Sequence, residues 1–97
     1  MEEVKKFRDL VVGKTYIVHS YSEPYNSNYG ISYIVRISNA HSDYDNIIKI
    51  WSTKLMAEYI STVCPHNKFR FTVNQRDSKK YPVIEGYRRG HKFKELQ

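Results

Sequence analysis

The chain has 97 residues, a formal net charge of +6, 14% aromatic residues and nine tyrosines. This length accommodates one domain with one modest core, and the frequent aromatic and branched residues exclude a disordered chain. No apolar run approaches the roughly 18 residues of a membrane-spanning helix, so we expect no membrane insertion.

Alternation of apolar and polar residues predicts five strands. In the first strand, Tyr16 and Tyr21 are expected on opposite faces. Residues 23–30 and 75–80 are dense in turn formers or charges and predict a hairpin loop and a charged turn. The segment before residue 10 predicts an arm or a single helical turn. The predicted strands cover residues 14–21, 31–38, 47–51, 68–74 and 81–87.

One helix is predicted over residues 53–63, between the third and fourth strands. Ser52 is the expected N-cap, because its hydroxyl can accept a bond from an N–H of the first turn. Pro65 is expected to end the helix. The apolar stripe that repeats with helical period consists of Leu55, Met56, Tyr59, Ile60 and Val63.

Three strands, a helix and two strands follow one another in the order of the OB-fold, a five-stranded Greek-key barrel. We therefore expect a mainly β protein, an OB-fold-like β-barrel with one α-helix between strands 3 and 4, although other small α+β folds share this order. The single domain, 1–97, would have its core over about 10–87 and a basic tail over 88–97. Pro82 marks the fifth strand as an edge or a strand end, and such an edge could pair with another copy of the chain.

The positive charge is concentrated in the last third of the sequence. Residues 1–67 contain seven basic and seven acidic side chains, whereas residues 68–94 contain nine basic and two acidic ones. A one-sided positive field favours a polyanion, such as nucleic acid, an acidic protein or an anionic membrane surface. A solubilising surface is the alternative reading of the same charge.

The residue patterns of catalysis and metal binding are missing from the sequence. The four histidines are dispersed, and there is no glycine-rich phosphate loop or nucleophile elbow. Cys64 and His66 are zinc-ligand types without the second pair of a structural site, and Asp43 and Asp45 are expected to cap a turn. We therefore expect no enzyme, no cofactor and no metal site.

Tyrosines and cations are interleaved as single-stranded nucleic acid binding requires. Aromatic rings stack on exposed bases, and Lys and Arg neutralise phosphates. In an OB barrel the bound strand crosses strands 2 and 3, flanked by the 1–2 and 4–5 loops. The candidate contacts there, together with the tail, are Tyr21, Tyr25, Tyr29, Arg36, Tyr44, Lys49, Trp51, Arg70, Arg76, Lys79, Lys80, Tyr81, Arg88 and Arg89.

The tyrosines divide into two groups by their sequence neighbours. Tyr25, Tyr29 and Tyr44 lie among Ser, Asn and Asp, so we expect them at the surface. Trp51 could either plug the barrel or stack on a base. Tyrosines that fall in register with apolar residues are expected in the core, namely Tyr16, Tyr33 and Tyr59.

Short motifs in residues 12–18, 28–35 and 83–87 carry a family resemblance. Gly-Lys-Thr-Tyr leads into the first predicted strand, and Tyr-Gly precedes the second. The chain thereby resembles the OB-fold-like domains of small single-stranded-DNA-binding proteins of DNA viruses and mobile elements of arthropods. The resemblance implies single-strand binding without strong sequence preference, in replication or strand protection. The matching positions are Lys14, Tyr29 and Gly30.

The leading hypothesis is a non-enzymatic single-stranded DNA-binding protein. An RNA-binding form of the same module is a further hypothesis, which the 2′-hydroxyl would distinguish. The alternative from another class is a protein-interaction module whose basic face meets an acidic partner, for example a viral inhibitor of a host factor. The charged N-terminus is unlike a signal peptide and Cys64 cannot form an internal disulfide, so we expect an intracellular protein of the nucleus or cytoplasm.

Overall fold

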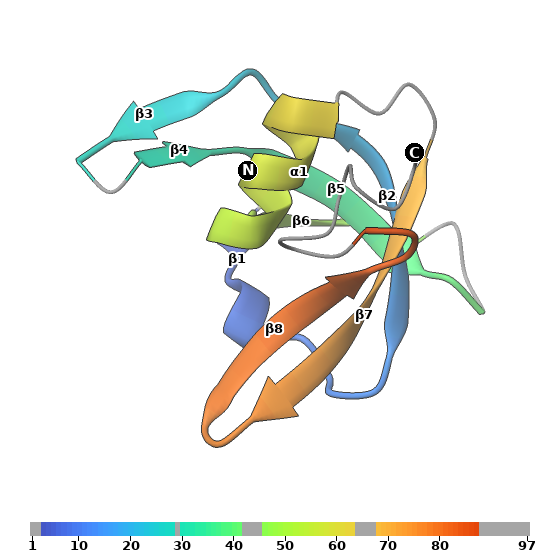
Figure 1. Ribbon diagram of the computed structural model, residues 1–97. Helices are drawn as coiled ribbons and strands as arrows, with labels where there is room; N and C mark the ends of the chain where they lie inside the picture. The colour runs from blue at the N-terminus through green and yellow to red at the C-terminus, as the bar shows by residue number, and fades with distance from the viewer. Residues whose placement is uncertain (1–2, 29, 42–45, 64–67, 88–97) are drawn as a thin grey trace, which may run out of the picture.

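The computed structural model describes residues 3–28, 30–41, 46–63 and 68–87, and it is mainly β (Figure 1). A mixed six-stranded sheet has the order β1-β6-β5-β2-β7-β8, and β3 and β4 form a separate two-stranded sheet. Among the described strands, the larger sheet is open, with β1 and β8 at its edges. The mainly β class is confirmed, and the strand pairing does not close a barrel. The strands are β1 (Val4–Lys5), β2 (Thr15–Tyr21), β3 (Tyr25–Ser27), β4 (Gly30–Ser32), β5 (Ile34–Asn39), β6 (Ile48–Trp51), β7 (Phe69–Arg76) and β8 (Lys79–Ile84), and the helices are the 3-10 helix η1 (Phe7–Asp9) and α1 (Lys54–Val63).

A β-hairpin replaces most of the loop predicted over residues 23–30. Strands β3 and β4 pair antiparallel, with Tyr25 opposite Ser32. Gly30 has a φ of +113°, a conformation that side-chain-bearing residues rarely adopt. Glycine is therefore suited to this end of the hairpin. The loop prediction was wrong because the turn-forming residues here also serve as short strands that pair only with each other.

The strand predicted over residues 31–38 is interrupted at Tyr33. The Tyr33 N–H donates to Ser52 Oγ at 2.9 Å, and the Ser52 N–H donates to the Tyr33 carbonyl at 2.8 Å. Because the Ser52 hydroxyl is engaged in this way, the next residue caps α1. The N–H of Met56 donates to Thr53 Oγ1 at 3.2 Å, so the prediction of Ser52 as the N-cap was wrong by one residue.

A β-bulge at His19 changes which face the end of β2 presents. Val18 pairs with Ile37, but the next pair joins Ser20 to Arg36, so His19 is the extra residue. The prediction that simple alternation holds through Tyr21 was therefore wrong. Tyr21 is in register with buried Val35, and its ring packs edge-on against Tyr33.

The core lies between the sheet and α1, and Phe71 is at its centre. Phe71 is 1% exposed, and its ring contacts those of Phe7 and Tyr16 at centroid distances of 5.8 and 5.6 Å. The predicted burial of Tyr16 and Tyr33 is confirmed. Tyr59 is partly buried and packs against the core. The helix contributes Met56, Ala57 and Ile60 to the core cluster.

The N-terminal segment, residues 4–10, belongs to the fold rather than to a peripheral arm. Strand β1 pairs parallel with β6, and Phe7 and Leu10 are buried in the core. Lys80 Nζ, on β8, donates to the carbonyls of Arg8 and Leu10 at 2.8 and 2.6 Å. The segment thus contacts both edge regions of the open sheet, and the core begins before the predicted boundary near residue 10.

Pro82 lies on the edge strand β8, as predicted. It is in register with Val73, whose N–H donates to the Lys14 carbonyl and whose carbonyl accepts from the Gly13 N–H. The backbone of Val73 therefore points away from β8, so this pair needs no ladder bond. The donor that proline lacks is missing from the open edge, which makes that edge a poorer template for another strand.

Candidate functional site

A depression of about 320 Å³ lies over β5 and β6, beside the base of the β3–β4 hairpin. We call it the β5–β6 depression. Its described lining contains two tyrosines, one cation and one isoleucine on β5, and one cation on β6, and none of these described residues carries a carboxylate. The lining residues are Val4, Ser20, Tyr21, Ser22, Tyr25, Ile34, Arg36 and Lys49.

Strand register places two cations side by side in this depression. Arg36 on β5 is directly opposite Lys49 on β6. Val4 and Ser20 continue the same row onto β1 and β2. Neighbouring strands are about 4.8 Å apart, and like charges directly opposite each other destabilise a sheet. An anion bound between them would relieve this repulsion.

Exposed aromatic rings adjoin the two cations. Tyr25 is 50% exposed, and its ring meets Trp51 edge-on at a centroid distance of 5.5 Å. Trp51 is 37% exposed and in register with Ile34 of the depression. The sequence was compatible with Trp51 either in the core or at the surface. The structure places it at the surface. Tyr21, also in the lining, is 39% exposed.

Ser22 fixes the point at which the chain leaves β2 for the hairpin. Its N–H donates to the Ile34 carbonyl at 2.9 Å, and its Oγ accepts from the Ile34 N–H at 3.0 Å. The Ser22 hydroxyl also donates to the Glu23 carbonyl at 2.8 Å. These bonds hold Tyr21 and Tyr25 on either side of an anchored residue, so the aromatic wall of the depression is positioned by the backbone.

The candidate cations that were predicted in the 4–5 loop, Arg76, Lys79 and Lys80, do not line the β5–β6 depression. A tight turn at Asp77 joins β7 to β8, so Arg76 ends β7, whereas Lys79, Lys80 and Tyr81 belong to β8. In Figure 1 the β7–β8 turn lies at the bottom of the view, whereas strands β3 and β4 lie at the upper left. A second depression of about 490 Å³, lined by Thr53, Lys54, Leu55, Arg76, Lys80, Tyr81 and Pro82, holds three of these candidates.

Lys80 has a structural role in this second depression. Its ammonium group holds the carbonyls of Arg8 and Leu10, which uses two of the three N–H donors of a lysine. Arg70 and Lys79 are exposed on β7 and β8, and neither lines either depression. The structure thus brings Tyr21, Tyr25, Arg36 and Lys49 together, with Trp51 adjoining, and separates them from the β7–β8 candidates.

Several sequence predictions lie outside the described residues. They concern the candidate contacts Tyr29, Tyr44, Arg88 and Arg89, the helix-ending Pro65, and the weighed ligand types Asp43, Asp45, Cys64 and His66. Within the described ranges, no group of three or more His, Cys, Asp or Glu side chains could hold a metal ion. Neither described helix has the length and apolar character to cross a membrane.

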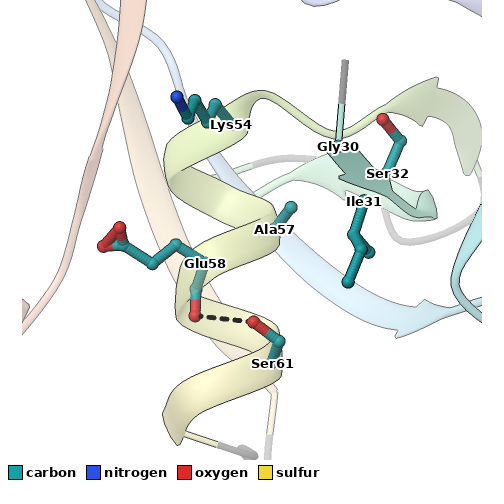
Figure 2. Close-up of a pocket in the computed structure, with 7 residues that line it drawn as sticks. All are labelled: Gly30, Ile31, Ser32, Lys54, Ala57, Glu58 and Ser61. Carbon is teal, nitrogen blue, oxygen red and sulfur yellow. Dashed lines mark hydrogen bonds between the residues drawn. The ribbon is translucent and has the colours of Figure 1, made fainter. Parts of the chain in front are cut away.

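A third depression, of about 570 Å³, lies between β4 and α1. Figure 2 shows Ala57 pointing toward the hairpin, whereas the side chains of Lys54 and Glu58 turn away from it. Glu58 accepts from the Tyr87 hydroxyl at 3.1 Å, so its carboxylate is directed to the other side of the helix. The exposed side chain of Ile31 adds a further apolar group. Among the described lining residues, no charged groups therefore converge to form a chemical site in this depression.

Comparisons with known proteins give no family assignment. No protein-family model matches the chain, and no curated protein or solved structure matches it. The resemblance to small single-stranded-DNA-binding proteins thus remains a prediction based on the motifs at Lys14 and Gly30.

Proposed function

We propose that the protein binds single-stranded DNA in the β5–β6 depression, without strong sequence preference and without catalysing a reaction. The observation that supports this proposal is the meeting of Tyr21, Tyr25, Arg36 and Lys49 in one depression, whose described lining residues include no carboxylate. Exposed rings can stack on bases of any sequence. The paired cations can bind phosphates and release counterions.

The strand arrangement also favours this proposal. The sheet order β6-β5-β2-β7-β8, with α1 between β6 and β7, is the order of strands 3-2-1-4-5 in an OB-fold. We infer an open OB-fold-like arrangement in which the β3–β4 hairpin extends the connection between the first two strands. The β5–β6 depression then corresponds to the strand 2–3 face on which OB-folds bind oligonucleotides.

The shape of the site favours a single strand over a duplex. Bases in a duplex are already stacked on their neighbours, whereas a single strand can turn a base onto a protein ring. The depression, at about 320 Å³, is at the lower end of the range for small-molecule pockets. It therefore suits part of a flexible strand better than the wide surface of a double helix.

The test is a titration of a fluorescent oligothymidine, followed by anisotropy at two salt concentrations. We expect affinity to fall steeply with salt and to exceed that for a matched duplex. Tyr25→Ala should weaken binding by about 5- to 150-fold, the value of one stacked base. Tyr81→Ala is the matched control, because Tyr81 is also exposed but lines the second depression.

Three outcomes would contradict the proposal. Absence of salt-sensitive binding at low ionic strength would exclude a nucleic acid site of this kind. Equal losses for Tyr25→Ala and Tyr81→Ala would exclude the β5–β6 depression as its location. Weak oligonucleotide binding that is indifferent to Tyr25, with recovery of one defined acidic protein, would support the protein-interaction alternative. Competition between matched DNA and RNA strands separates the two nucleic acids.

A further inference from the structure

His19 lies where the β5–β6 depression meets the β7 side of the sheet. It is the extra residue of the β2 bulge, next to Ser20 of the depression and opposite the step from Arg36 to Ile37 on β5. On the other side of β2, Val18 pairs with Phe69 of β7. Continuing this antiparallel register by one residue places Lys68 beside His19. The bulge therefore sets an imidazole between two cations from different parts of the chain.

A hydrogen bond to Ser38 helps to orient the His19 ring. Its Nε2 is 2.7 Å from Oγ of Ser38 on β5, and Ser38 is 1% exposed. Arg36 and Lys68 are exposed, whereas His19 is partly buried. The ring is thus held by a buried hydroxyl while both neighbouring cations extend toward solvent.

We propose that His19, Arg36 and Lys68 form a phosphate-binding subsite over the β2 bulge, continuous with the β5–β6 depression. This inference rests on the proposed function, because Arg36 belongs to both places. A strand whose base stacks beside Tyr25 would place a neighbouring phosphodiester over the bulge. From there its backbone would run toward the β7 side of the sheet, where Arg70 is exposed.

Phosphate binding at this subsite is coupled to protonation of the His19 ring, because the charges around the ring change when phosphate binds. Burial lowers the pKa of His19, and the positive charges of Lys68 and then Arg36 lower it further. The charged groups that lie nearest the bulge along the two flanking strands are Arg36 from β5 and Lys68 and Arg70 from the β7 side. A bound phosphate offsets these positive charges and adds a negative one, which raises the pKa of the ring.

The sign of the pH effect follows from this linkage. In the free protein the pKa of His19 is below its usual value of 6.5, so the ring is neutral at pH 7. In the complex the pKa is higher, so binding takes up a proton and affinity rises as the pH falls through this range. Each unit by which the two pKa values differ corresponds to a tenfold change in affinity.

Titration of fluorescent oligothymidine between about pH 5.5 and pH 8, at fixed ionic strength, tests the subsite. Thymine has no group that titrates in this range. We expect the wild-type protein to bind more tightly at the acidic end. His19→Gln, which can still bond to Ser38, should lose the pH dependence. His41→Gln is the matched control, because His41 is exposed in the β5–β6 connection, and it should behave as the wild type.

An NMR titration of the His19 ring gives a second readout. Its pKa should rise when oligothymidine is added, and in the free protein it should rise in Lys68→Ala, which removes one repelling charge. Binding that persists with no pH dependence and no change in the pKa of His19 would overturn the subsite and leave the proposed function intact. Absence of binding at every pH would overturn both.

Discussion

Arg36 and Lys49 face each other directly across β5 and β6 within one depression. A directly opposed pair of like charges lowers the stability of a sheet. The arrangement is understandable if the two charges serve a shared anionic ligand. Stability and binding should therefore respond in opposite directions when one of the charges is removed.

Replacing Arg36 with Gln should separate these two effects. We expect the free energy of unfolding to rise by about 0.2–1 kcal/mol, because the cross-strand repulsion is relieved. The salt dependence of oligothymidine binding should decrease by about 0.7 in the log–log slope, the loss of one phosphate contact on a single strand. Arg70→Gln is the control for stability, since Arg70 pairs with Ile17 across β2 and β7. Equal stability changes in both variants would contradict the repulsion argument.

Lys80 should matter for stability rather than for ligand binding. Lys80→Met keeps the aliphatic stem but loses the bonds to the carbonyls of Arg8 and Leu10. We expect a loss of about 1.5 kcal/mol in urea unfolding, since the donor is charged. Lys79→Met, at an exposed neighbour, should leave stability unchanged. A stable Lys80→Met protein with weakened oligothymidine binding would instead make Lys80 a ligand contact.

The cap of α1 gives a prediction that distinguishes two adjacent hydroxyl residues. Thr53→Ala should cost about 1 kcal/mol, because the Met56 N–H loses its side-chain acceptor. Thr53→Ser retains the oxygen and should restore most of that loss, which chemical denaturation can measure. Wild-type stability in Thr53→Ala would show that the helix does not depend on this cap.

Tyr59 predicts a loss of stability in alkali. Burial raises the pKa of Tyr59 above its usual value of 10, so the folded state favours the neutral phenol. The contribution of the neutral Tyr59 phenol to the free energy of unfolding is fully present below pH 10. It is lost as the pH rises from there through the pKa of the folded state. Tyr59→Phe removes the ionisable group, and the alkaline decrease in its free energy of unfolding should be smaller than in the wild type. Identical alkaline profiles would contradict the assignment.

Most strands of the larger sheet could be predicted from sequence because each contributes residues to a single core. Phe69, Phe71 and Val73 all point inward, so the strand that carries them is recognisable from period-two spacing. Strand β3 of the hairpin could not be predicted in the same way. All three of its residues, Tyr25–Ser27, are exposed, so it has no buried face and its sequence resembles that of a loop.

The candidate site was predictable in part for a similar reason. Arg36 and Lys49 lie on strands whose apolar neighbours fix their orientation, so the expected order of elements was enough to place them on one face. The bulge at His19 leaves no trace in the alternation of residues, because it depends on pairing with β5. The position of Lys80 depends on a contact with residues 70 and 72 positions away, which local patterns cannot indicate.

The N-terminal segment has a consequence for how the chain is made. Phe7 and Leu10 leave the ribosome before Lys80, whose ammonium group holds this segment from about 70 residues further along the chain. Chains grow at about 5–20 residues per second, so these apolar side chains wait for seconds before β8 can receive them. We expect the segment to be among the last parts to dock, and nascent chains that end before β8 to be prone to aggregation or chaperone capture.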